Sequence, residues 1–363
     1  MIDFDAGDEL ELVRATAADF ASDQLRPAMR EQESARKVSD AARAAYEEIG
    51  LSTLAWPEGL GGSGLGALAH AIVLEELAAG DPGAALALDP LGPSLYPLLE
   101  FGGEAALAEF GVPLLKQVGA RALLVWNGTG TRARLQRDGD FLSGSIPWVP
   151  SDRVDLLVVL DDEGAVVVRD GTQTISLRGA GLRAAGASEV ALAKAPLCAQ
   201  WHDPVAARRC LARARLYQTA MLIGVMREAA DYSRNYALDR VAFGKPIAHH
   251  QALAFLIVDM ATAVDSARLL CHEAAWRLDG GLDAEEACAT AFVEAVEAAG
   301  FVTPNAVQIL GGHGFMLDHP VEKFMRDARS LGLVLGGVDL AREEAGRELS
   351  GTAGPVALGV ETA

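Results

Sequence analysis

The sequence predicts a mainly α-helical protein with a small antiparallel β domain in the middle of the chain. Residues 1 to about 118 are rich in Ala, Leu and Glu at helical spacing, residues 119–200 change to short β-type runs, and the helical period then returns. This order differs from the alternating strand and helix order of Rossmann folds and TIM barrels, and it disfavours both. We therefore expect three domains, at residues 1–118, 119–200 and 201–363.

The first domain is expected to consist of helices. Apolar residues recur every three or four positions over residues 10–25, and the Ala-rich stretch 67–79 is a strong helix former that ends at Gly80-Asp81-Pro82. Gly59-Leu-Gly-Gly-Ser-Gly64 matches the dinucleotide-binding pattern G-x-G-x-x-G, but Trp56-Pro57 interrupts the strand that should precede it. We interpret this segment as a glycine-rich turn before a helix.

Turn signals predict the second domain, and the helical spacing of apolar residues predicts the third. Asp-Gly pairs at 138–139 and 170–171 separate short β runs at 141–146, 154–160, 165–168 and 174–177, which is typical of hairpins. Helical spacing follows, with helices expected near residues 205–238, 249–279, 283–299, 303–311 and 320–349.

Composition excludes several classes of function. Lys and Arg number 31 against 50 Asp and Glu, and the formal net charge of −19 disfavours binding to nucleic acid or to an anionic membrane. Charges interrupt every apolar stretch before about 18 residues, so no membrane span is expected, and the start of the sequence lacks the pattern of a signal peptide. Four scattered cysteines favour a reduced, cytoplasmic compartment. The histidines show no metal-ligand spacing, and we expect no metal site.

Two segments of the last domain are candidates for ligand binding. In Arg240-Val-Ala-Phe-Gly-Lys-Pro-Ile247, between two long helices, an arginine next to Phe-Gly could clamp a phosphate; the alternative is a helix–helix turn capped by Gly244. In Gln308-Ile-Leu-Gly-Gly-His-Gly314 a helix end opens into glycines, where a ligand can approach the backbone; the alternative is a helix C-cap.

Together these segments resemble the acyl-CoA dehydrogenase family over nearly the whole chain. The motifs that carry the resemblance are Arg240-x-x-Phe-Gly-x-x-Ile247 with Gln251, Gln308-x-x-Gly-Gly-x-Gly314, Asp318-x-Pro-Val-Glu-x-x-x-Arg-Asp327, Trp56-Pro-Glu-x-x-Gly-Gly62, Leu74-Glu-Glu-Leu77, Trp148 and Gly181-Leu-Arg-x-x-Gly186.

The resemblance implies a fold and a chemistry. The fold is an N-terminal helical domain, a small β domain and a C-terminal four-helix bundle. The chemistry is the α,β-desaturation of an acyl-CoA thioester by FAD, with electron-transfer flavoprotein as the acceptor. FAD in this family lies across a subunit interface, and the ADP half would be held here by Arg240, Phe243, Gln251, Gln308, Gly311 and Gly312.

The chain departs from the family where the chemistry takes place. The usual catalytic glutamate falls on Leu335, and the position used by some relatives falls near Ala214, so neither place carries a base. The flavin loop of the family is replaced by the shorter Val125–Thr131 segment, and Pro150 stands where a hydroxyl-bearing residue is usual. No catalytic residue is therefore assigned to this chain.

These departures lead to the hypothesis of a partner subunit. The chain would supply the ADP-half site to a related acyl-CoA dehydrogenase subunit that carries the catalytic Glu, in an α2β2 heterotetramer similar to the actinobacterial enzymes of steroid side-chain breakdown. Three alternatives stay open. They are a self-sufficient homotetramer with a displaced base at Asp339 or Glu343, a flavin monooxygenase or oxidase on the same fold, and a non-enzymatic structural or CoA-binding module.

Overall fold

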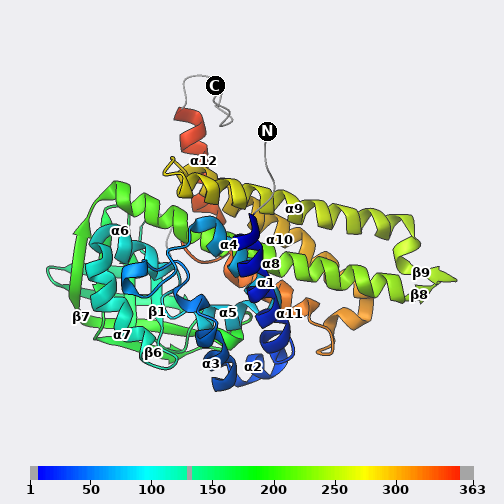
Figure 1. Cartoon of the computed structure of the whole chain (residues 1–363), viewed down its shortest axis with the longest axis horizontal. Coiled ribbons are helices and arrows are strands. Elements are labelled where there is room, and N and C mark those ends of the chain that lie inside the picture. Colours follow the sequence, from blue (N-terminus) through cyan, green and yellow to red (C-terminus); the bar gives the residue numbers. More distant parts are fainter. Residues whose placement is uncertain (1–6, 129–132, 352–363) are drawn as a thin grey trace.

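The computed structural model describes residues 7–128 and 133–351, and it places a sheet beside a bundle of long helices (Figure 1). The N-terminal helices lie between the two. They are α1 (Gly7–Phe20), α2 (Met29–Ala35), α3 (Asp40–Glu48), α4 (Ala67–Gly80), α5 (Pro82–Leu88), α6 (Leu95–Ala106) and α7 (Val112–Leu115). The predicted stop after α4 is confirmed, because Asp81 caps α5 by accepting hydrogen bonds from Gly83 N (2.9 Å) and Ala84 N (3.3 Å).

The β domain is a seven-stranded sheet within the described residues. Its strands are β1 (Ala122–Trp126), β2 (Arg134–Asp138), β3 (Phe141–Val149), β4 (Leu156–Leu160), β5 (Gly164–Val168), β6 (Thr172–Ser176) and β7 (Ser188–His202). The order is β1-β4-β5-β7-β3-β2, with β6 paired to β7. The pairs are antiparallel except that β1 runs parallel to β4. The expectation of an antiparallel sheet thus fails at this one pair, because the long connection through β2 and β3 returns the chain in the direction of β1.

The C-terminal domain is built on three long helices. They are α8 (Pro204–Asp239), α9 (Gln251–Asp279) and α10 (Glu285–Leu310), followed by the shorter α11 (Val321–Leu331) and α12 (Gly337–Gly351). A small hairpin of β8 (Val241–Ala242) and β9 (Lys245–Pro246) joins α8 to α9 at the end of the molecule far from the sheet (Figure 1). The helices expected at 205–238 and 249–279 are confirmed.

Two of the expected helix boundaries are wrong. Helices were expected at 283–299 and 303–311, but α10 continues through Pro304 because its buried face, from Ala295 to Ala306, packs along the bundle. One helix was expected over 320–349, but the chain turns between α11 and α12. Leu335, Gly336 and Gly337 there have φ values of +54°, +83° and +70°, which no α-helix accommodates.

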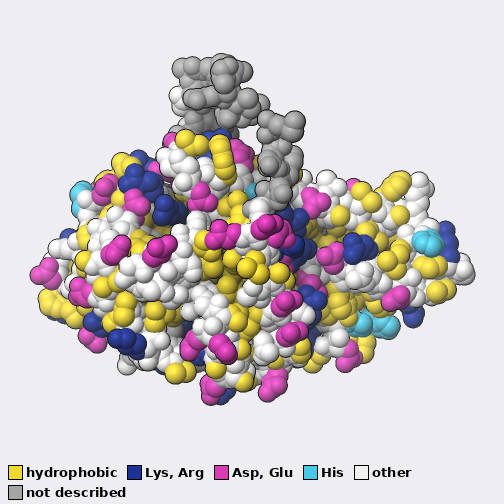
Figure 2. Space-filling model, viewed as in Figure 1, with side chains coloured by type: hydrophobic (Ala, Val, Ile, Leu, Met, Phe, Trp, Pro, Cys, Tyr) yellow, Lys and Arg dark blue, Asp and Glu magenta, His cyan; other side chains and the backbone are white. Residues whose placement is uncertain are grey.

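The surface visible in Figure 2 mixes acidic and basic side chains with apolar ones. Over residues 7–128 and 133–351, no helix combines the length and apolar character needed to cross a membrane.

Candidate functional site

The turn that carries Leu335 lines a cavity between the N-terminal helices, the sheet and α8. Leu335 is 6% exposed, and the cavity has a volume of about 50 Å³. Pro150 and Val149 line it from the end of β3, and Leu86 lines it from α5. The usual catalytic glutamate of the family falls on Leu335, so a catalytic base would be expected at this cavity.

No carboxylate is among the residues that line this cavity. Its polar side chains are Arg121 and Gln218. Arg121 is 7% exposed and donates from Nη1 to the carbonyl oxygen of Asp89 at 2.9 Å. Its Nε and the Oε1 of Gln218 have no hydrogen-bond partner among the described residues. Burial lowers the pKa of Arg121, but a guanidinium has no lone pair for a proton, and an amide is no base. The cavity therefore offers hydrogen bonds without offering a general base.

The alternative positions for a base give the same result. Ala214 on α8 is fully buried in one apolar cluster with Leu335, Trp126 and Leu340, so the two family positions meet in space and both are apolar. The Asp339 side chain is 91% exposed and lies 3.5 Å from Arg342, and Glu343 is exposed. Neither carboxylate lines the cavity.

Among the remaining departures from the family, only Pro150 is known to line this cavity, as judged from the described residues. Pro150 is part of its lining, and Trp148 on β3 is half-buried against the main core. Within the Val125–Thr131 segment, Val125 and the buried Trp126 end β1, whereas residues 129–131 lie outside the described residues.

The predicted ADP-half residues lie at the opposite end of α8. Arg240 follows the last residue of this helix, and its carbonyl oxygen accepts from Ile247 N at 2.8 Å, which closes the β8–β9 hairpin. Phe243 at the tip is 96% exposed and has a φ of +53°. Gln251 is exposed at the start of α9. Arg240, Phe243 and Gln251 are thus gathered within one connection.

The second predicted segment lies beside the same end of α8. Gln308 is exposed on the last turn of α10, and Gly311 and Gly312 are exposed after it. A hydrogen bond of 2.7 Å joins the Tyr236 hydroxyl, one turn before Arg240, to Nδ1 of His313. This bond holds the Gln308–Gly312 segment next to the end of α8, so the structure brings the two predicted segments together.

One chain cannot bring both regions to the same cofactor. Ala214, which shares a cluster with Leu335, precedes Arg240 by 26 residues along α8. At about 1.5 Å of rise per residue this separation is about 39 Å, which is longer than an extended FAD molecule. The cavity at Leu335 and the surface at Arg240 of one chain are therefore too far apart to contact the same FAD molecule.

Comparison with known proteins decides the family. Residues 7–117 match the N-terminal domain of acyl-CoA dehydrogenase, and residues 204–349 match its C-terminal domain. The mitochondrial short-chain specific acyl-CoA dehydrogenase of Bos taurus is 30% identical over 92% of this chain and 88% of its own length. The chain belongs to the acyl-CoA dehydrogenase family.

Solved structures agree on the fold. Butyryl-CoA dehydrogenase from Megasphaera elsdenii superposes with a TM-score of 0.84 at 23% identity, over 96% of this chain and all of that chain. A glutaryl-CoA dehydrogenase from Mycobacterium smegmatis in complex with FADH2 superposes with a TM-score of 0.83 at 21% identity, over 96% of each chain. The two family models and the relative of 30% identity make the chain an oxidoreductase-type flavoprotein of this family with FAD as its cofactor.

The exposed surface at Arg240 fits the nucleotide end of FAD. A Cβ atom built on Gly311 or Gly312 meets no atom within 4 Å, so open space lies in front of this backbone. Arg240 can offer a guanidinium fork to a pyrophosphate, and Gln308 can offer an amide to polar groups of the nucleotide. The cavity at Leu335, in contrast, contains no group able to take a proton from a substrate.

Other family motifs turn out to be structural. The buried Glu75 and Glu76 on α4 accept hydrogen bonds from Arg227 on α8, at 2.9 and 2.5 Å. Asp327 on α11 accepts from Leu182 N at 2.6 Å. The sequence analysis did not identify Arg121 and Gln218. An arginine directly before the apolar run of β1 is a sequence signal that could have indicated Arg121. No local pattern marks Gln218.

Proposed function

We propose that this chain is the nucleotide-holding subunit of a hetero-oligomeric acyl-CoA dehydrogenase. It supplies the surface around Arg240, Phe243, Gln251, Gln308, Gly311 and Gly312 to the ADP half of an FAD whose ring lies in a related subunit. That partner carries the catalytic Glu, and the pair assembles as α2β2. The single observation that carries the proposal is the cavity at Leu335, which no carboxylate lines.

The reaction explains why this observation matters. Desaturation needs a base that removes the α-proton of the acyl-CoA, and FAD, when bound, would supply the acceptor for the β-hydride. Loss of a general base alone typically costs about 10²–10⁴ in rate. Leu335 and Ala214 have no lone pair, and Asp339 is in solvent, so this chain's own cavity cannot perform the step.

The size of the cavity at Leu335 also supports a flavin ring that lies in a related subunit. Its volume of about 50 Å³ is a third of the roughly 150 Å³ that an apolar protein cavity offers to one benzene ring. The three fused rings of a flavin together with a thioester need much more space. The Arg240 surface, in contrast, is open and carries the polar groups that a nucleotide requires.

The substrate, the electron acceptor and the cellular location complete the proposal. The substrate is an acyl-CoA, with steroid side-chain CoA thioesters as the proposed class, and its acyl pocket lies mainly in the partner. Electron-transfer flavoprotein is the proposed acceptor. The cytoplasm is the proposed location, because Cys210, Cys271 and Cys288 are buried free thiols that suit a reducing compartment.

Co-expression tests the proposal. The chain would be produced alone and together with a related acyl-CoA dehydrogenase chain that carries the catalytic Glu, and flavin absorbance and acyl-CoA-dependent dye reduction would be measured. We expect little flavin and no activity in the lone chain, and one FAD per pair of unlike subunits in the complex.

A matched pair of variants locates the flavin. Arg240→Ala in the complex should lower the bound flavin at least about tenfold. Arg209→Ala, at the other end of α8 and paired with Glu100 at 2.6 Å, should leave it unchanged. A lone homo-oligomer with one FAD per chain and full dehydrogenase activity would show that the division of labour is wrong.

A further inference from the structure

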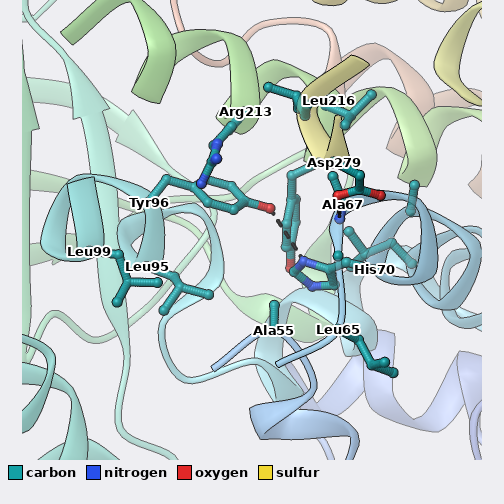
Figure 3. Close-up of a pocket in the computed structure, with 15 residues that line it drawn as sticks. Ala55, Leu65, Ala67, His70, Leu95, Tyr96, Leu99, Arg213, Leu216 and Asp279 are labelled. Atoms are coloured by element: carbon teal, nitrogen blue, oxygen red, sulfur yellow. Dashed lines mark hydrogen bonds between the residues drawn. The ribbon is translucent and has the colours of Figure 1, made fainter. Parts of the chain in front are cut away.

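A second, larger cavity lies between α4, α6, α8 and the end of α9 (Figure 3). Its volume is about 140 Å³. None of the residues that line it lines the Leu335 cavity. It therefore belongs to neither site described above.

The walls of this cavity are largely leucine side chains. They come from four separate parts of the chain and are Leu65, Leu74, Leu95, Leu99, Leu216 and Leu278. The volume is close to the roughly 150 Å³ of an apolar cavity that binds benzene. The cavity thus has room for an apolar body of about one six-membered ring.

Arg213 brings a positive charge to this apolar space. Its side chain enters from α8, next to Tyr96, and is half-buried (Figure 3). Among the described residues no hydrogen bond or ion pair is assigned to Arg213, in contrast to Arg209 one turn earlier, which is paired with Glu100. A half-buried guanidinium with no protein partner is a binding site for an anion.

The other polar groups of the cavity leave this charge unbalanced. Asp279 accepts hydrogen bonds from Ala67 N (2.6 Å) and Leu68 N (3.0 Å), so the N-terminus of α4 compensates its charge. The Tyr96 hydroxyl lies 3.3 Å from Nδ1 of His70. Burial lowers the pKa of His70, which keeps this ring neutral at pH 7.

We propose that this cavity binds a small monocarboxylate. Its carboxylate pairs with Arg213, and its apolar body, of the size of one ring or a short branched chain, packs against the leucines. A dicarboxylate would bring its second charge against leucine side chains or Asp279, and a CoA thioester exceeds the volume. The inference does not depend on the subunit role proposed above.

Binding of benzoate to the full-length chain tests this site. Isothermal titration calorimetry would compare the wild type with Arg213→Gln and with the control Arg209→Gln, which removes a charge from the same helix outside the cavity. We expect one benzoate per chain, with binding weakened at least about tenfold in Arg213→Gln and less than about twofold in the control. Benzyl alcohol, which lacks the charge, should bind both Arg213 forms equally.

A cavity-filling variant keeps the test independent of charge. Leu99→Trp should abolish binding of benzoate and benzyl alcohol, while far-ultraviolet circular dichroism shows an unchanged helix content. The proposal would be overturned if benzoate bound equally well to Arg213→Gln or still bound to Leu99→Trp. It would also be overturned if benzoate at 10 mM or more did not bind to the wild type, because 10 mM is roughly the weakest dissociation constant that a short carboxylate with one ion pair should show.

Discussion

Replacing Lys323 by Met should destabilise the chain strongly, because Lys323 links three parts of the fold. Its side chain is fully buried, and Nζ lies 2.8 Å from Oδ1 of Asp81 and 2.7 Å from Oδ2 of Asp327. Asp81 caps α5, and Asp327 holds the backbone of Leu182 in the connection between β6 and β7. Desolvation alone would lower the pKa of Lys323, but the two carboxylates outweigh it and raise that pKa, so the amine is charged.

The magnitude follows from what remains after the substitution. Removing one member of a buried ion pair typically costs about 3–5 kcal/mol, because the other charge is left without compensation. In Lys323→Met two carboxylates are left, but each keeps a backbone donor, so we expect a loss of about 4 kcal/mol. This is a large part of the roughly 5–15 kcal/mol that stabilises a typical protein.

The stability loss of Lys323→Met should also depend on pH in a defined direction. Burial already raises the pKa of the Asp81 carboxyl above that of an unfolded chain, which lies near 4, and loss of the Lys323 charge raises this pKa further. The deficit is then complete above the folded-state pKa of Asp81 and shrinks as the pH falls toward 4. Urea unfolding, followed by tryptophan fluorescence at pH 7.5 and pH 5.0, measures it. The exposed Lys116→Met is the control. Equal stability of wild type and Lys323→Met at pH 7.5, or a deficit that grows at pH 5.0, would refute the reasoning.

Two further substitutions test the site and the core. Leu335→Glu in the lone chain should give no dehydrogenase activity in dye reduction, because the Arg240 surface is proposed to serve another FAD. The free energy of unfolding in urea should also fall by about 2–4 kcal/mol, because a carboxylate replaces a buried leucine. Gain of activity would contradict the division of sites. Burial raises the pKa of Glu228 to about 7 despite its ion pair with Arg26. Glu228→Gln should therefore stabilise the chain by about 1–3 kcal/mol above pH 7, with the gain vanishing as the pH falls toward 4.5; an equal gain at pH 8 and pH 4.5, or a gain from the exposed Glu11→Gln, would count against this.

The long helices could be predicted from the sequence because their periodicity extends over many turns. α8 and α9 differ from the expected ranges by at most two residues at either end. β7 was not predicted, since its 15 residues alternate irregularly, with Lys194 at a φ of +51°. The parallel pairing of β1 with β4 is a long-range property that no local pattern encodes.

The candidate site and its surroundings also contain some features that the sequence predicts and others that it does not. The resemblance predicts Arg240 and Gln308 as binding residues, and the structure holds their segments together through Tyr236 and His313. The partnership of Lys323 with Asp81 spans 242 positions in the sequence, so no motif reveals it. The leucine cavity at Arg213 is likewise formed by residues that meet only after folding.

The turn at Leu335 shows how a catalytic position becomes a core position. A φ of +54° costs a leucine roughly 1–2 kcal/mol relative to an ordinary backbone conformation. Burial of the same side chain among Trp126, Ala214 and Leu340 contributes about 2 kcal/mol, which offsets that cost. A carboxylate at this position would carry the backbone strain and a desolvation penalty together, and only catalysis would favour keeping it. Leucine therefore stabilises a chain whose cavity does not perform proton abstraction, while the Arg240 surface stays exposed, as its proposed role of holding the nucleotide of another subunit requires.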